Sequence, residues 1–256
     1  MMTVRTNVKI NLGLEVLRKR PDGFHDIETL FIPYDGFGDV LSIGPGSGMV
    51  DISPCDWDPR TDLTVRAYGL LKQDFPDIPP VDIRLEKGAP VGAGLGGGSA
   101  DAAFALRLYN ELFGLGLGTD GLASYAARLG SDCAFFVYNR PMFGSGRGEV
   151  LEPFDIDLSA YALRVEVPEG VHVSTREAYS GIVPRCSGPV PRVADLREVL
   201  SLPVEEWRDR LGNDFEPGVF AAHPEIAALK DRMYEDGAVY AAMSGSGSAV
   251  FGLFAR

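Results

Sequence analysis

The order of hydrophobic and polar positions along the chain predicts a mixture of strands and helices. Hydrophobic and polar residues alternate over 9–14 and 81–85, which is typical of strands with one buried face. Segments with helical spacing that end at glycine or proline are expected at 61–73, 99–113, 122–129, 193–200, 204–210 and 224–236. The expected strands lie within 4–51 and 141–151 and at 81–85, 134–138, 162–167, 239–242 and 249–254.

The densest glycine segment lies where a predicted strand gives way to a predicted helix. Residues 90–103 read PVGAGLGGGSADAA, with five glycines in the seven positions 92–98 and Ser99 as the expected N-cap of the helix. So few side chains let another group approach the backbone, and the helix adds free N–H donors and partial positive charge. We expect a phosphate-binding loop. The alternative, a flexible linker, does not usually join a strand to a capped helix.

Two common phosphate-binding schemes do not fit this loop. Gly92, Gly94 and Gly97 match the letters of the dinucleotide fingerprint, but that fold needs a second parallel strand within about thirty residues. The chain instead continues through 114–120 into another helical pattern, and the next strand-like run, 134–138, comes too late. A Walker A loop is excluded because no Gly-Lys-Ser/Thr follows the glycines.

Length and charge narrow the class of protein. The 256 residues suffice for about two domains, and the change of pattern near Glu152 and Pro153 predicts domains at 1–152 and 153–256. A formal net charge of −12 argues against nucleic acid as a partner, since a phosphate backbone requires a basic surface. That charge does not argue against a nucleotide substrate, which needs only local donors.

Cysteine and histidine spacing and the absence of long apolar runs point to a cytoplasmic protein. The three cysteines are far apart and form no Cys-x-x-Cys pair, which favours reduced thiols: Cys55, Cys133 and Cys186. No stretch has the length of a membrane span or the pattern of a signal peptide. The three histidines lack the spacing of metal ligands. We expect a cytoplasmic location and no membrane partner.

Three further segments carry polar groups whose role the pattern alone leaves open. Lys9, Asn11 and Gly13 share one face of a strand. This pattern fits equally well a face that binds a ligand and a face on which Lys9 is simply exposed to solvent. The loop 243–248, MSGSGS, suits a hairpin turn and a substrate-facing loop equally. Asp132 lies at the mouth of the expected strand 134–138, where it suits a turn residue or a catalytic acid.

Phe24 and His25 lie side by side in the turn 20–26. Phe24 on its own is more typical of a core residue. The alternative is an aromatic surface on which a flat nucleobase stacks.

In this order the segments resemble the GHMP small-molecule kinase superfamily. The resemblance spans residues 9–252 and rests on the lysine strand, the glycine loop, Gly130-Ser131-Asp132-Cys133 and the late Ser-Gly-Ser-Gly loop. It implies an α+β protein of two GHMP kinase domains, the first like domain 2 of ribosomal protein S5 and the second ferredoxin-like. The active site is then expected in the interdomain cleft.

The resemblance also implies a reaction, its cofactors and a set of site residues. Lys9-Ile10-Asn11-Leu12, the turn with Phe24 and His25, and the tripled glycine before Ser99 resemble the members that phosphorylate a cytidine diphosphate polyol of the mevalonate-independent isoprenoid pathway. ATP would donate its γ-phosphoryl group to the 2-hydroxyl of that substrate, with Mg²⁺ as the expected metal. Asp132 would be the base and Lys9 its partner. The ATP-binding residues would be Pro90, Val91, Gly92, Ala93, Gly94, Leu95, Gly96, Gly97, Gly98, Ser99 and Ala100.

The same resemblance assigns residues to the polyol and the base. Asn11 and Thr175 would hold the polyol, His25 would contact the cytosine edge, and Phe24 and Tyr179 would stack on its two faces. The chain departs from the usual pattern at two positions. Ala100 stands where a second serine is usual, so we assign no metal ligand, and Phe24 stands where tyrosine is frequent.

Three alternatives remain at this stage. A related kinase for homoserine, mevalonate or a sugar has no need of the aromatic residues Phe24 and Tyr179. A non-catalytic nucleotide-binding module has no need of Lys9 and Asp132. An NAD(P)-dependent enzyme is disfavoured by the missing second strand.

Overall fold

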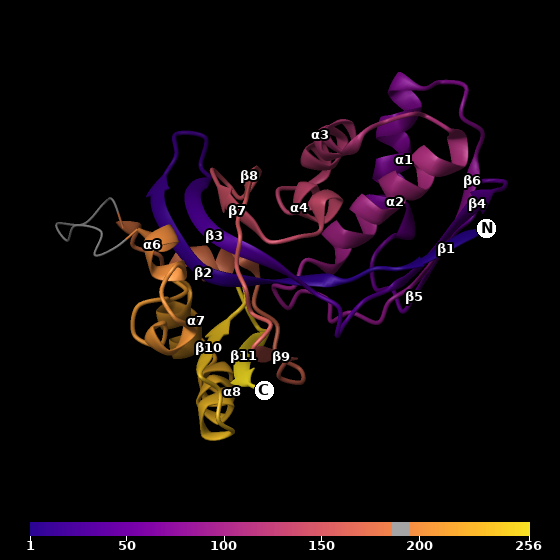
Figure 1. Cartoon of the computed structure of the whole chain (residues 1–256). Helices are drawn as coiled ribbons and strands as arrows, with labels where there is room; N and C mark the ends of the chain where they lie inside the picture. The colour runs from indigo at the N-terminus through magenta and orange to yellow at the C-terminus, as the bar shows by residue number, and fades with distance from the viewer. Residues whose placement is uncertain (186–194) are drawn as a thin grey trace. The chain divides into compact units, whose positions relative to one another are not determined.

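The computed structural model describes residues 1–185 and 195–256, which form two compact units (Figure 1). The first unit comprises residues 1–9, 33–91 and 96–140, and the second comprises 10–32, 92–95 and 141–256. Neither unit is one continuous stretch, because the chain passes from one to the other several times. Cys186 and residues 193–194, for which the sequence made predictions, lie outside the described residues.

The first unit is a four-stranded sheet with helices gathered on one side of it (Figure 1). The strand order is β1 (Met2–Arg5), β4 (Val40–Pro45), β6 (Val81–Glu86) and β5 (Val50–Ser53). Neighbouring strands are antiparallel except for the parallel pair β5 and β6. The helices are the 3₁₀ turn η1 (Pro59–Thr61), α1 (Leu63–Asp74), α2 (Gly97–Phe113), α3 (Thr119–Leu129) and α4 (Cys133–Tyr138).

Helix α2 is the central helix of this unit, and its sequence explains its burial. Alanines line much of its length and let α1 and α4 pack closely against it. It ends at Gly114 as predicted, in a left-handed conformation with φ 60°. It begins at Gly97 rather than Ser99, because Gly96 with φ 73° serves as the N-cap. The prediction of Ser99 as N-cap is therefore wrong.

The predicted strand at 134–138 is also wrong, since these residues form α4. The run AFFVY is apolar throughout, and all but its last residue are buried in the packing against α2 and α3. A short apolar run without alternation fits a buried strand and a buried helix equally well. Asp132 consequently lies at the N-cap of a helix and not at a strand end.

The second unit contains two sheets. One has the order β2 (Val8–Lys19), β3 (His25–Tyr34), β7 (Met142–Ser145) and β8 (Val150–Pro153), and the outer residues of β2 and β3 belong to the first unit. The other has the order β10 (Tyr240–Met243), β11 (Val250–Ala255) and β9 (Tyr161–Glu166), all antiparallel. The helices are α5 (Thr175–Ser180), α6 (Leu196–Leu200), the 3₁₀ turn η3 (Val204–Glu206), α7 (Glu216–Ala222) and α8 (Pro224–Glu235).

Most predicted elements of this unit are confirmed. Strands near 141–151, 162–167, 239–242 and 249–254 are present, and α8 covers β10 and β11. The helix predicted over 204–210 is wrong, because only three residues there form a 3₁₀ turn. Val8–Val16 of β2 are buried on both faces, so the interpretation of Lys9 as a solvated residue is wrong as well.

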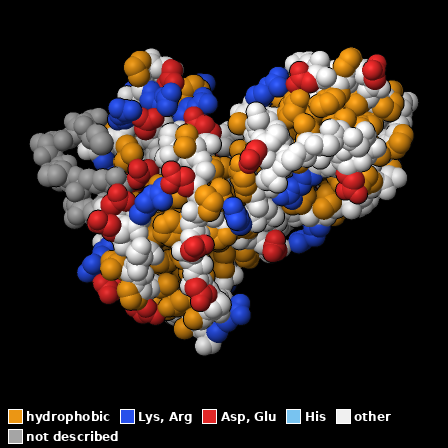
Figure 2. Space-filling model, turned by 45° about the horizontal axis from the view of Figure 1, so that its top comes forward, with side chains coloured by type: hydrophobic (Ala, Val, Ile, Leu, Met, Phe, Trp, Pro, Cys, Tyr) orange, Lys and Arg blue, Asp and Glu red, His pale blue; other side chains and the backbone are white. Residues whose placement is uncertain are grey.

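The visible surface mixes charges of both signs: Figure 2 shows Lys and Arg side chains interspersed with Asp and Glu. Among residues 1–185 and 195–256, no helix combines the length and the apolar character that crossing a bilayer requires.

One buried amide holds the turn between β10 and β11. Asn213 donates from Nδ2 to the carbonyl oxygens of Met243 and Gly245, both at 2.8 Å, and its Oδ1 accepts from Phe215 N at 3.0 Å. The backbone on either side of Asn213 bonds to Leu14 of β2. The late glycine-serine turn therefore depends on a side chain about thirty residues earlier in the chain.

Replacing this amide should lower stability markedly. Asn213→Ala leaves two buried carbonyl oxygens and one N–H without their partner, which we expect to cost about 2–4 kcal/mol. Asn213→Asp should cost at least as much, since a carboxylate would face two carbonyl oxygens. Urea unfolding of both variants measures the loss. Asn110→Ala, whose amide bridges only Leu117, is the control. A loss for Asn213→Ala no larger than that of the control contradicts the interpretation.

Candidate functional site

Lys9 of β2 and Asp132, just before α4, form an ion pair in the first unit. Lys9 Nζ lies 3.7 Å from Asp132 Oδ2, with the lysine side chain 4% exposed and the aspartate side chain 29% exposed. Burial lowers the pKa of Lys9, and the negative charge of Asp132 opposes that shift. Ser131 donates its hydroxyl to Asp132 Oδ1 at 3.2 Å. The pair thus combines a buried cation with a carboxylate that remains reachable.

The first turn of α2 lies against this pair. A Cβ atom at Gly96 would lie 3.4 Å from Lys9 Cε and 3.1 Å from the Phe136 ring. Ser99 hydrogen-bonds with Cys133, the residue after Asp132, and burial raises the pKa of that thiol to about 12. The free N–H groups and partial positive charge at the start of this 17-residue helix therefore lie beside Lys9 and Asp132.

Three glycines at alternate positions of the glycine loop adopt the left-handed conformation. Gly92, Gly94 and Gly96 all have φ between 71° and 75°, and their neighbours do not share that left-handed conformation. Alternation of this kind turns successive N–H groups toward one side of the chain. The phosphate-binding role of residues 90–100 stays a prediction.

The late glycine-serine loop is both a hairpin turn and a neighbour of the glycine loop. Within the second unit, Ala249 N donates to Ala93 O at 3.0 Å and the Ser244 hydroxyl to Gly94 O at 3.3 Å. A Cβ atom at Gly94 would lie only 2.3 Å from Ser244 O. The two loops pack backbone against backbone, which is possible only without a side chain at Gly94.

The residues predicted to bind a nucleobase are only partly brought together. The rings of His25 and Tyr179 stack, with centroids 4.7 Å apart and planes 19° apart, and Tyr179 meets Phe215 edge to face. Burial, with the charge of Lys19, lowers the pKa of His25, so its imidazole is neutral at pH 7. Phe24 is 54% exposed, and the Arg147 guanidinium lies 4.9 Å from its ring centroid.

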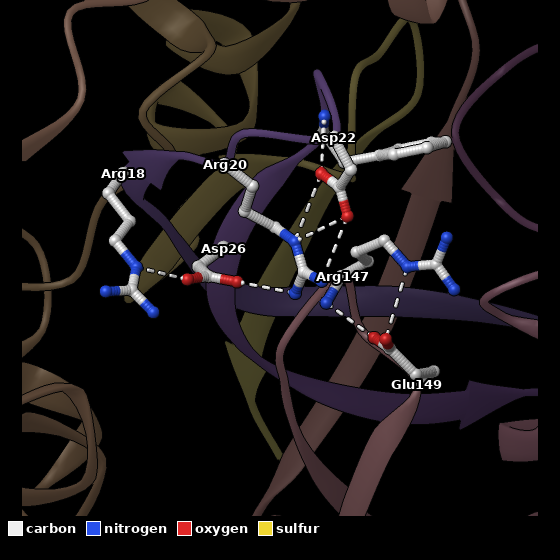
Figure 3. A network of polar contacts seen from close by, with 7 residues as sticks. Arg18, Arg20, Asp22, Asp26, Arg147 and Glu149 are labelled. Carbon is white, nitrogen blue, oxygen red and sulfur yellow. Dashed lines mark hydrogen bonds and ion pairs between the residues drawn. The ribbon is translucent and has the colours of Figure 1, made fainter.

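The turn that carries Phe24 is held by a network of charged side chains (Figure 3). Arg20 bonds to both Asp22 and Asp26, and Asp22 Oδ1 accepts from Phe24 N at 3.1 Å. Arg147 bonds to Glu149 in the hairpin between β7 and β8. Sequence reasoning missed Arg147, because it belongs to no motif and lies more than a hundred residues from Phe24.

The two residues predicted to hold a polyol differ in their setting. Asn11 is buried, and its Nδ2 donates to Thr29 Oγ1 at 3.0 Å, while Thr29 donates to Gly13 O at 2.6 Å. Thr175 is exposed at the first position of α5. Sequence reasoning also missed Asp39, Lys87 and Asp101, which form a buried cluster beside the glycine loop.

The described residues contain no group of three or more His, Cys, Asp or Glu side chains that could hold a metal ion. A cation that binds chiefly through phosphate oxygens does not require such a group.

Comparison with known proteins identifies the family. The family models for the GHMP kinases N terminal domain and the GHMP kinases C terminal domain match residues 62–140 and 193–256. The chain is 48% identical to proteins named 4-diphosphocytidyl-2-C-methyl-D-erythritol kinase from Bacteroides fragilis (strain YCH46) and Parabacteroides distasonis. These alignments cover 97% and 98% of this chain and 90% of each relative. The boundary expected at 152–153 stays a prediction.

Solved structures give the same result. A crystal structure of 4-(cytidine 5'-diphospho)-2C-methyl-D-erythritol kinase matches with a TM-score of 0.80 and 34% identity, over 98% of this chain and 90% of that one. Homoserine kinase from Cytophaga hutchinsonii matches with a TM-score of 0.66 at 17% identity, over 98% and 85%, and shows a shared fold only. The predicted α+β fold of the GHMP kinases is confirmed.

These comparisons exclude the NAD(P)-dependent enzyme, since the chain has the fold and the domains of kinases. The predicted enzyme class, an ATP-dependent small-molecule kinase, is confirmed by the same findings. The chain belongs to the 4-diphosphocytidyl-2-C-methyl-D-erythritol kinase family of the GHMP kinases.

Proposed function

We propose that this kinase transfers the γ-phosphoryl group of ATP to the 2-hydroxyl of 4-diphosphocytidyl-2-C-methyl-D-erythritol, in the methylerythritol phosphate route to isoprenoids. The observation that carries the proposal is the ion pair of Lys9 and Asp132 beside the first turn of α2. A protein that only holds ATP has no need of a reachable carboxylate next to a buried lysine. The relatives named above supply the substrate.

Asp132 is the proposed base and Lys9 its partner. The substrate hydroxyl gives its proton to the Asp132 carboxylate as its oxygen forms a bond to the γ-phosphorus, and the bond to the β-phosphate oxygen breaks to release ADP. Lys9 holds the carboxylate in place at 3.7 Å and adds positive charge near the transferring group. A positioned base contributes roughly 10²–10⁴ in rate.

The glycine loop and the start of α2 are the proposed phosphate site. Their backbone N–H groups would bind phosphate oxygens without a lysine of the Walker type. Mg²⁺ would neutralise phosphate charge, and it typically keeps waters and takes few protein ligands. The Ser99 hydroxyl, on the first turn of α2, is an oxygen that could serve as a ligand of Mg²⁺. Ala100 has no such oxygen.

The second unit supplies the proposed contacts to cytidine and polyol. A neutral His25 can donate with one ring nitrogen and accept with the other, as an amino-pyrimidine edge requires. Tyr179 fixes the His25 ring plane by stacking, and the exposed ring of Phe24 offers a face to the base. We retain Tyr179 as a second stacking residue, and Asn11 and Thr175 as contacts to the polyol.

The proposal is tested by supplying several acceptors to the purified protein. With ATP and Mg²⁺ present, we expect ADP release with 4-diphosphocytidyl-2-C-methyl-D-erythritol and not with homoserine, mevalonate or galactose. Phosphorus NMR should locate the new phosphate on the tertiary hydroxyl. Turnover with one of the other acceptors would show that the protein is a kinase but that its substrate is not the cytidine compound. ATP binding without turnover on any acceptor would favour the non-catalytic nucleotide-binding module.

Asp132→Asn should separate ATP binding from turnover. The amide keeps the size of the side chain but cannot accept the hydroxyl proton, so kcat should fall by about 10²–10⁴. The dissociation constant for ATP, measured by calorimetry, should change less than threefold. Asp120→Asn, an exposed acid at the start of α3, is the control and should keep wild-type turnover. Near wild-type kcat in Asp132→Asn would reject the base.

Phe24→Ala should weaken binding of the cytidine substrate alone. Loss of base stacking is worth about 1–3 kcal/mol, so the KM for that substrate should rise roughly tenfold while the KM for ATP stays constant. Phe24→Tyr is the matched control, since it retains the aromatic face. Equal KM values for Phe24→Ala and Phe24→Tyr would show that Phe24 does not stack on the base.

A further inference from the structure

Three charged side chains of the first unit are buried together beside the glycine loop. Lys87 Nζ lies 2.5 Å from Asp39 Oδ2 and 2.7 Å from Asp101 Oδ2. The exposed fractions of the three side chains are 6%, 0% and 1%. Thr6 completes the cluster, because its hydroxyl donates to Asp101 Oδ1 at 3.1 Å and accepts from Asp39 N.

The cluster joins the segment that enters the glycine loop to the helix that leaves it. Asp39 Oδ1 accepts from Gly88 N and Ala89 N, both at 2.7 Å, immediately before Pro90. Asp101 lies in α2, which begins where the glycine loop ends. A Cβ atom at Gly97 would lie 3.7 Å from Asp39 Oδ2, so the first turn of α2 packs directly on the cluster.

Burial disfavours the ionised form of Asp101. Burial raises the pKa of Asp101 to about 7, and the negative charge of Asp39 adds to this rise, against the opposing effect of Lys87. A carboxyl group whose folded-state pKa is raised stabilises the fold at low pH and loses that contribution as pH rises through about 7. Above pH 7 one lysine faces two buried carboxylates, an arrangement that costs stability.

We propose that Asp101, through Lys87 and Asp39, is a positioning residue for ATP: the buried cluster clamps both ends of the glycine loop and holds its N–H groups in their binding conformation. The inference rests on the proposed role of this loop in binding ATP phosphates. In this role Asp101 contacts neither the phosphates of ATP nor the acceptor substrate. Because the loop is already ordered before ATP binds, binding does not have to meet the conformational entropy cost of ordering it.

The expected effect follows from the cost of ordering a backbone. Fixing one residue of a loop costs enough free energy to weaken binding about tenfold. Without the Asp101 carboxylate, Lys87 remains paired with Asp39, but α2 is no longer joined to the segment before Pro90. The ATP dissociation constant should therefore rise about tenfold while the fold remains intact.

The experiment compares Asp101→Ala and Asp101→Asn with the wild-type protein at pH 8. Calorimetry with ATP and Mg²⁺, without acceptor, should give an approximately tenfold weaker affinity for Asp101→Ala. Asp101→Asn keeps an oxygen for Lys87 and should bind ATP within threefold of wild type. Asp101→Asn should keep the wild-type thermal midpoint, whereas Asp101→Ala leaves the buried Thr6 hydroxyl without its acceptor and should lower it. The KM for the cytidine substrate should stay within threefold in both variants.

The control is Asp82→Ala, in the strand β6 that directly precedes Lys87. Asp82 of β6 accepts from the backbone of Ser47, Gly48 and Met49, so its loss should lower the thermal midpoint without changing ATP affinity. Unchanged ATP affinity in Asp101→Ala overturns the inference, as does an equal loss of affinity in Asp82→Ala. Because the calorimetry needs no acceptor, failure of the cytidine assignment would leave this result standing.

Discussion

The absence of side chains along the glycine loop is a constraint on which the packing inside each unit depends. At Gly94 the loop meets the backbone of the late hairpin, where a Cβ atom would be 2.3 Å from a carbonyl oxygen. At Gly96 the same loop turns into α2 directly over the Lys9 side chain. A side chain at Gly94 would collide with the hairpin backbone, and one at Gly96 would crowd the Phe136 ring and the Lys9 side chain, both at a positive φ that L side chains rarely adopt. The glycines therefore serve packing, and the same absence of side chains suits the phosphate role that we propose for them.

A second principle is that buried lysines are matched to carboxylates of different exposure. Lys87 is enclosed with two buried acids, and that cluster can only hold the backbone in place. Lys9 is equally buried, but its partner Asp132 is 29% exposed. Only the second pair leaves a carboxylate that an incoming hydroxyl can reach. The same ionic chemistry thus has a structural role in one place and suits catalysis in the other.

Sequence patterns predicted the features that depend on local chemistry. The glycine loop, the end of α2 at Gly114 and the closing pair β10 and β11 follow from residue types within a few positions. The strand expected at 134–138 was wrong because apolar residues buried on all sides carry no periodicity. The N-cap of α2 was predicted at Ser99 because serine is a frequent N-cap residue, but Gly96 in the left-handed conformation takes that position.

The parts of the site that the sequence could not predict are contacts between distant segments. Asp39, Lys87 and Asp101 become neighbours only after β4, β6 and α2 have packed, and no spacing rule relates them. The family resemblance made Lys9 the partner of Asp132 and placed Phe24, His25 and Tyr179 around a cytosine, since it transfers a known arrangement onto matching residues. It did not predict that His25 and Tyr179 stack on each other. It assigned no role to Arg147, which lies outside the quoted motifs, or to Asp101, which lies within the segment 90–103. Residues of that kind are found from burial and hydrogen bonding between distant segments, which only the folded structure brings together.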